Sequence, residues 1–303
     1  MKNNSKFLLF LSAGLIITSL LWQNPALAAN PQNSNSGAGL NASYNWAGYV
    51  TTGSNITSVS GTWIVPQVPA TANFSADAAW IGIGGVTGSD LIQTGTQEIV
   101  NNSAVTYQAW YELMPGLSRP ISITVNPGDS ISASITEQSA NQWTISLRDN
   151  TNGQNFNTTV TYNSSLSSAE WVEEMPSQGN GGFIPLDNFG SISFSGGYAV
   201  ESGNTVNIAG AGAQSMAMYN SQNQALATPS ALGNDGASFM VSRNSAVATS
   251  PAATTVPYGR SGWRRVGVGV QGFTGLVTQP RAQRQRTNFS LRFRLSFKNF
   301  DGR

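Results

Sequence analysis

The sequence of 303 residues contains no histidine and no cysteine. A chain without them cannot build a Ser-His-Asp triad, a Cys-His pair, a histidine-ligated zinc site or a disulfide. Lysine occurs only at Lys2, Lys6 and Lys298, which argues against a Ser-Lys dyad. An enzyme of this composition has to draw its acid, base or nucleophile from carboxylates, with amides and hydroxyls in support.

Charge is also scarce, since Asp, Glu, Lys and Arg together make up 10% of the chain, and the two signs are segregated. Residues 29–242 hold 13 acids against two arginines and carry a formal net charge of −11, whereas residues 243–303 carry +10. The sequence therefore predicts an acidic domain followed by a basic tail. Few of the acids can pair with a cation, so lowering the pH should relieve repulsion and break few salt bridges. We expect the domain to keep its fold near pH 3.

The amino terminus has the pattern of a targeting segment. Two lysines precede an apolar run over residues 7–22, and an A-L-A sequence follows at 26–28. The run is shorter than the ~20 residues that a membrane span needs. Residues 1–28 are therefore predicted to be a secretory signal peptide, which makes the mature protein extracellular and free of the membrane. Residues 29–43 are rich in Asn, Ser and Gly and are expected to form a flexible leader.

Short apolar runs that alternate with polar residues recur through the chain after the leader, and no helical period is present. Such alternation is typical of antiparallel strands with one apolar and one polar face. We expect one all-β domain over 44–242, a sandwich of two antiparallel sheets, followed by the basic tail over 243–303. The expected strands cover 45–50, 58–65, 78–84, 91–97, 104–113, 121–125, 131–135, 143–147, 168–177, 190–195, 215–219 and 237–242.

The segment 168–177 reads S-A-E-W-V-E-E-M-P-S and holds three carboxylates in five residues. In a strand, Glu170 and Glu174 point to one face of the sheet, whereas Glu173 points to the other. Two acids on one face are either part of a solvated surface or line a cleft. The sequence leaves both readings open.

Three further strands carry polar and aromatic side chains beside small residues. On each strand, the side chains of one face form a row that belongs either to ordinary surface or to the wall of a groove that could hold an extended polymer. The rows are Trp80, Gly82 and Gly84; Gln93, Gly95 and Gln97; and Gln108, Trp110 and Glu112.

Seven motifs in order resemble the glutamic peptidases, also called eqolisins. They are N-W-A-G-Y at 45–49, S-G-T-W-I-V-P at 60–66, A-W-I-G-I-G at 79–84, L-I-Q-T-G at 91–95, Y-Q-A-W-Y-E at 107–112, A-E-W-V-E-E at 169–174 and F-I-P-L-D-N-F-G at 183–190. The resemblance implies a sandwich of the legume-lectin type and a secreted endopeptidase that works at acidic pH on polypeptide substrates. It implies Gln93 and Glu174 as the catalytic pair, with Trp80, Trp110 and Glu112 lining the substrate groove.

The implied pair suits peptide hydrolysis without a metal or cofactor. An ionised Glu174 can take a proton from the attacking water and return it to the leaving amine. The amide of Gln93 can hold that water and donate a hydrogen bond to the oxyanion. We expect a monomer.

Two alternatives stay open, because a lectin-like sandwich also hosts other functions. A glycoside hydrolase could use Glu170 with Glu174 or Glu112 as its two carboxylates, and a carbohydrate-binding module would need no catalytic group. The basic tail could be disordered, bind an anionic surface or clamp onto the acidic domain. Its arginines could bind nucleic acid, but an exported protein is not expected to meet that partner.

Overall fold

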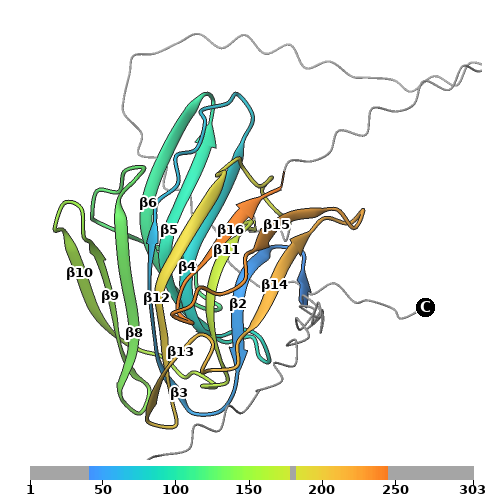
Figure 1. Ribbon diagram of the computed structural model, residues 1–303. Coiled ribbons are helices and arrows are strands. Elements are labelled where there is room, and N and C mark those ends of the chain that lie inside the picture. The colour runs from blue at the N-terminus through green and yellow to red at the C-terminus, as the bar shows by residue number, and fades with distance from the viewer. Residues whose placement is uncertain (1–40, 178–181, 245–303) are drawn as a thin grey trace, which may run out of the picture. The chain divides into compact units, whose positions relative to one another are not determined.

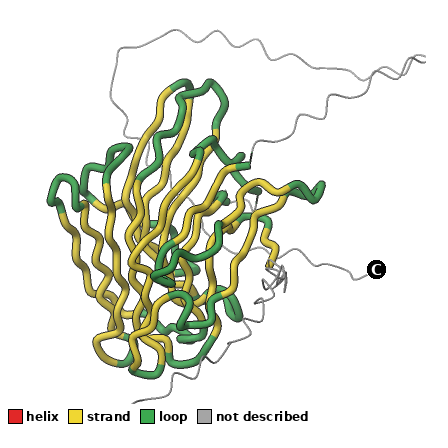
Figure 2. Tube along the Cα trace, viewed as in Figure 1, coloured by secondary structure: helices red, strands yellow, loops and turns green. Residues whose placement is uncertain are grey.

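The structure is a computed structural model that describes residues 41–177 and 182–244. Within these ranges the chain forms sixteen β-strands and no α-helix (Figures 1 and 2), so they contain no helix that could span a membrane. The strands are β1 (Asn41–Ser43), β2 (Trp46–Thr52), β3 (Ile56–Ile64), β4 (Ser75–Gly84), β5 (Leu91–Asn101), β6 (Ala104–Leu113), β7 (Arg119–Ile121), β8 (Ser130–Ser139), β9 (Gln142–Asp149), β10 (Asn155–Thr161), β11 (Ser168–Glu174), β12 (Ser191–Glu201), β13 (Asn204–Asn207), β14 (Gln214–Tyr219), β15 (Ala225–Pro229) and β16 (Phe239–Arg243).

Hydrogen bonding links the strands in the order β10-β9-β8-β3-β12-β16-β15-β14-β2-β11-β4-β5-β6-β7, with β13 beside β12. Neighbours along this path are antiparallel, whereas β1 pairs in parallel with β14. The sheet turns over on itself, because β3 and β8 contact β4 and β5. The expected all-β, antiparallel class is confirmed. The strand pairing is one continuous path, so the division into two separate sheets stays a prediction.

Tryptophans hold the folded sheet together from inside. Trp63 on β3 donates its indole N–H to Thr96 Oγ1 on β5 at 2.9 Å, and Trp171 on β11 donates to the Ser60 carbonyl on β3 at 2.8 Å. Burying an indole that also finds an acceptor combines a large apolar area with a satisfied polar group. In a chain without disulfides this core is the main source of stability.

The central strands are buried on both faces, which corrects the expectation of one wet face on each strand. Every residue of β4 and β11 is buried, and so is every residue of β5 except the last. The reason is a second apolar cluster on the face opposite the main core, which includes Trp46, Trp80 and Trp110. The solvated reading of Glu170 and Glu174 is therefore wrong, since both are fully buried.

Some expected boundaries differ from the structure. Strand β1 lies inside the segment 29–43 that is expected from its composition to be a flexible leader, and Arg243, the first residue of the expected tail, closes β16. The expected strand over 121–125 is wrong, because β7 ends at Ile121 and the following residues have no partner strand. The signal peptide, most of the leader and the tail beyond residue 244 lie outside the described residues.

Candidate active site

Glu174 is the last residue of β11, and two side chains hold its carboxylate. Asn45 Nδ2 donates to Oε1 at 2.8 Å, and Trp80 Nε1 donates to Oε2 at 2.9 Å. The two donors come from different parts of the chain, Trp80 from β4 and Asn45 from the residue before β2. A carboxylate offers about four lone-pair sites. Each oxygen of Glu174 can therefore accept one more hydrogen bond or a proton.

Gln93 on β5 and Glu112 on β6 form a second hydrogen-bonded pair. They are direct cross-strand neighbours, and Gln93 Nε2 donates to Glu112 Oε2 at 2.8 Å. Gln93 is fully buried, and its Oε1 has no hydrogen-bond partner among the described residues. A buried amide oxygen without a partner is uncommon in folded proteins. The Gln93 amide is thus oriented by Glu112 and keeps an acceptor and a second N–H for another molecule.

Trp80 connects these two pairs. It lies in a cross-strand row with Gly95 and Trp110, between the row of Glu174 and the row of Gln93. A Cβ on Gly82 would lie 2.8 Å from Trp80 Cζ3 and 3.3 Å from Gln93 Cβ. The indole therefore reaches over Gly82 to the side of Gln93 while its N–H binds Glu174.

The glycine opposite Trp80 is required by this packing. A Cβ on Gly95 would lie 2.5 Å from Trp80 Cβ and 2.2 Å from the Ala79 carbonyl oxygen, closer than atoms can approach. Trp46 packs edge-on against Trp80, with the ring centroids 4.8 Å apart and the planes at 77°. An edge-to-face pair of this kind fixes both rings, so the donor to Glu174 is held in place.

Burial raises the pKa of Glu174 well above its usual value, and the charge of Glu112 raises it further. The N–H groups of Trp80, Trp46 and Asn45 act on the pKa in the opposite direction, because they stabilise the ionised form. Glu174 therefore becomes a base only at a pH higher than an ordinary glutamate would need.

A match to a known protein family bears on the function of this arrangement of side chains. The model of the Peptidase A4 family matches residues 44–241. The chain belongs to the Peptidase A4 family. The resemblance to glutamic peptidases drawn from the seven motifs is thereby confirmed.

Two related proteins and one solved structure agree with this family assignment. The chain is 30% identical to aspergillopepsin-2 of Aspergillus niger over 189 residues, which are 54% of this chain and 67% of the relative. It is 35% identical to scytalidopepsin B of Scytalidium lignicola over 156 residues, which are 48% of this chain and 58% of the relative. A crystal structure of scytalido-glutamic peptidase with a transition state analog inhibitor superposes with a TM-score of 0.58 at 30% identity, covering 66% of this chain and 98% of that one. The chain is accordingly a glutamic peptidase, a hydrolase that acts on peptide bonds.

The strand register brings the five residues singled out in the sequence to one face of the sheet in this Peptidase A4 chain. Cross-strand partners lie on the same face, and the rows of Gln93 with Glu112, Trp80 with Trp110, and Glu174 with Ala78 are separated by two residues along the strands. Asn45, the donor to Glu174, is not among the five residues singled out from the sequence. Its position inside the N-W-A-G-Y motif was the available signal.

Glu170 lies on this face as well. It is the cross-strand neighbour of Gly82, whose other neighbour is Gln93. Glu170 and Ser168 are fully buried, and the hydroxyl of Ser168 stabilises the ionised form of Glu170. Burial raises the pKa of Glu170 well above its usual value, so this carboxyl is neutral over a wide acidic range.

The opposite face of the same strands holds a group of four buried carboxyls, which we call the core carboxyl cluster. Its members are Asp77 on β4, Glu98 on β5, Glu173 on β11 and Asp187 in the loop before β12. Their oxygens have no donor among the other described residues, whereas in the neutral form these carboxyls hydrogen-bond to one another.

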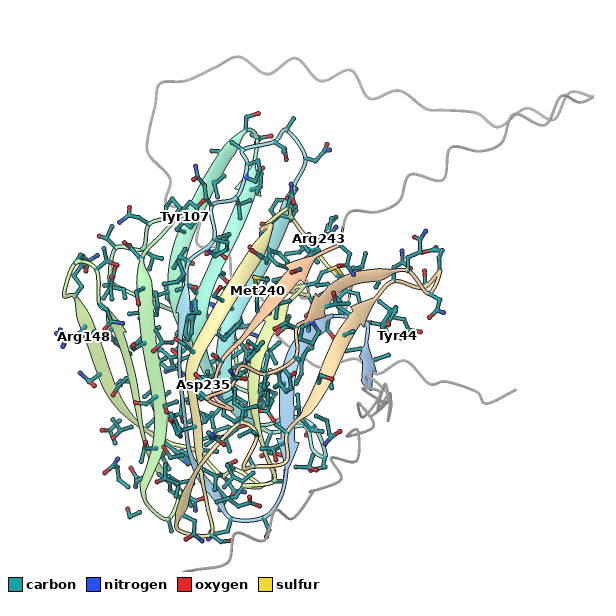
Figure 3. All side chains as sticks on the ribbon, in the orientation of Figure 1. Tyr44, Tyr107, Arg148, Asp235, Met240 and Arg243 are labelled. Carbon is teal, nitrogen blue, oxygen red and sulfur yellow. The ribbon has the colours of Figure 1, made fainter. Side chains whose placement is uncertain are left out.

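Loss of hydration on burial raises the pKa of every cluster member, that of Glu98 to about 8 and that of Asp187 to about 10. Two other ionisable side chains lie near, Arg243 and Tyr107, both labelled in Figure 3. The charge of Arg243 lowers the pKa of Asp187, but burial outweighs it. In the described part of the chain, no group of three or more His, Cys, Asp or Glu side chains is arranged to hold a metal ion.

Proposed function

We propose that this peptidase is a secreted endopeptidase that cleaves polypeptides in acidic medium with Glu174 as general base and Gln93 as oxyanion donor. The observation that carries the proposal is the position of Trp80, which donates to the Glu174 carboxylate at 2.9 Å and lies beside Gln93 over Gly82. A base and an amide joined by one aromatic side chain on a common face can act on the same water molecule.

The chemistry follows in two steps. Ionised Glu174 removes a proton from water as the oxygen attacks the scissile carbonyl carbon, and Gln93 donates a hydrogen bond to the developing oxyanion. The tetrahedral intermediate then collapses, the C–N bond breaks, and Glu174 returns its proton to the leaving amine. Glu112 supports the second role, since it accepts one N–H of Gln93 at 2.8 Å and so directs the other.

Two sets of carboxyls limit the working pH in this proposal. The raised pKa of Glu174 places the acidic limit of activity above the ordinary glutamate value. The core carboxyl cluster favours the folded state where it is neutral, which limits the enzyme on the alkaline side.

The remaining parts of the proposal concern the substrate and the setting. Trp80 and Trp110 lie in the strand row between Glu174 and Gln93 and are fully buried. They would form the floor of a groove that takes an extended polypeptide in a two-sheet, legume-lectin-like sandwich. The solved relative carries a transition state analog inhibitor, which supports a substrate-binding groove in this chain. The predicted signal peptide over 1–28 supports export, and a monomer suffices for a site built from one chain.

The test is digestion of an acid-denatured protein such as casein by the full chain between pH 3 and 6, read by mass spectrometry of the released peptides. The wild type should release internal peptides, and Glu174→Gln and Gln93→Ala should not. Glu137→Gln on β8 and Gln142→Ala on β9 make the same chemical changes away from the site and should behave as wild type. Hydrolysis of oligosaccharides that survives Gln93→Ala would identify a glycoside hydrolase instead, and binding of sugars without turnover would identify a carbohydrate-binding module.

A further inference from the structure

Asn45 donates a hydrogen bond to Glu174, and the roles implied by the sequence motifs do not include this residue. It lies between β1 and β2, is fully buried, and its Nδ2 is 2.8 Å from Glu174 Oε1. The two residues are 129 positions apart in the sequence. The contact therefore exists only because β2 pairs with β11, where Trp46 is the cross-strand neighbour of Glu174.

Ser43 fixes the orientation of the Asn45 amide. Its hydroxyl donates to Asn45 Oδ1 at 3.3 Å and accepts the backbone N–H groups of Asn45 at 3.1 Å and Trp46 at 3.0 Å. Serine side chains commonly hold a short turn in this way. With Oδ1 turned toward Ser43, Nδ2 is the atom that faces Glu174, and a flipped amide would lose both contacts.

We propose that Asn45, held by Ser43, is a positioning residue that fixes the Glu174 carboxylate for proton transfer. Asn45 holds Oε1 and Trp80 holds Oε2, so the plane of the carboxylate is set by one donor on each oxygen. The inference rests on the proposed function of Glu174 as the base. It adds a residue that acts on the reaction through Glu174 alone.

The charge on Glu174 depends on this contact. A buried carboxylate loses its hydration, and hydrogen bonds from N–H groups restore part of that stabilisation to the ionised form. Among the described ionisable groups that face Glu174, Glu112 on β6 acts against ionisation, while the uncharged N–H groups of Trp80, Trp46 and Asn45 favour it. Removing Asn45 should therefore move the titration of the base to higher pH.

The experiment measures kcat/KM against pH for the full chain with one peptide substrate. The acidic limb of this profile is the pH range over which kcat/KM rises as Glu174 ionises. Asn45→Ala should shift this limb to higher pH by about one to two units, the scale of one hydrogen bond to a charged group. At a pH below both limbs, kcat/KM should fall about tenfold for each pH unit by which the limb moves. Ser43→Ala leaves the amide in place but frees its orientation, so its limb should move in the same direction by less.

Thr51→Val is the matched control. Thr51 lies on the same strand as Trp46, is buried, and donates to the Ala211 carbonyl. Its loss should lower the unfolding temperature without moving the limb, which separates damage to β2 from an effect on Glu174. An acidic limb at the wild-type position in folded Asn45→Ala overturns the inference. If Asn45→Ala does not fold, a limb at the wild-type position in Ser43→Ala overturns it.

Measurements of kcat/KM also distinguish a failure of this inference from a failure of the proposed function. A wild type without peptidase activity, or a Glu174→Gln variant with full activity, would refute the role of Glu174 as the base and with it this inference. An inactive Glu174→Gln variant together with an Asn45→Ala limb at the wild-type position removes only the role of Asn45.

Discussion

Asp77 on β4 and Glu98 on β5 are direct cross-strand neighbours, and both are fully buried. Like charges directly opposite each other in a sheet repel, and no cation among the described residues lies between them. The arrangement is stable where the carboxyls are protonated, because neutral carboxyls can donate hydrogen bonds to one another. The interior of this protein is therefore suited to acid.

The first prediction is that the unfolding free energy falls as the pH rises from about 4 to 8. The cluster carboxyls have pKa values above those of the unfolded chain, to about 8 for Glu98 and about 10 for Asp187. The folded state keeps protons that the unfolded state releases, so the stabilisation is complete below pH ~4 and is lost as the pH rises through the raised values. Denaturant unfolding at four pH values measures this. Equal or greater stability at pH 8 than at pH 4 would contradict it.

The second prediction assigns that slope to the cluster. Glu98→Gln removes one titrating group and should flatten the fall by up to about 1.4 kcal/mol per pH unit within the window, the effect of one proton. Glu137→Gln on β8 is the matched control and should keep the wild-type slope. A Glu98→Gln variant with an unchanged slope would show that other groups govern the pH dependence.

The third prediction concerns the second donor to Glu174. Trp80→Phe keeps an aromatic ring on Gly82 but removes the N–H that lies 2.9 Å from Oε2. The acidic limb of kcat/KM should move upward by about one pH unit. Trp110→Phe, the same change on the same row, should move the limb less, even if KM rises. Identical limbs in the wild type and Trp80→Phe would rule out this role of the indole.

The fourth prediction tests the packing that places Trp80. A methyl group at Gly95 would overlap the Ala79 carbonyl and Trp80 Cβ. Gly95→Ala should cost about 1–3 kcal/mol of stability and reduce kcat/KM in the fraction that stays folded. Gly128→Ala is the control, because a Cβ added at Gly128 would have no atom within 4 Å and only the positive φ opposes the change. This variant should leave kcat/KM unchanged. Full activity in folded Gly95→Ala would mean that Trp80 can move without consequence.

Strand alternation predicted which side chains of one strand share a face, whereas the resemblance to glutamic peptidases joined residues of different strands into one candidate site. Gln93, Trp110 and Glu174 could be assigned to faces because side chains in a strand alternate regardless of tertiary structure. Asn45 could not be found this way, since it precedes β2 and meets Glu174 through a turn held by Ser43.

Long-range contacts explain the other misses. Asp187 joins the core carboxyl cluster from a loop that is tied to Ala76 on β4, a contact that no local pattern encodes. Conversely, Ile123 and Val125 alternate with polar residues but have no partner strand. The short strand β10 was missed because its Asn and Thr residues lack a clear apolar face.

The most direct test of the account is kcat/KM on one internally quenched peptide for the wild type, Gln93→Ala, Glu174→Gln and the double variant, all checked for folding at the assay pH. We predict that Gln93→Ala loses about 10²–10³-fold and Glu174→Gln about 10²–10⁴-fold. Because the two groups act on one water molecule, the double variant should lose little more than the less active single variant. A folded Gln93→Ala enzyme with wild-type kcat/KM would contradict the account.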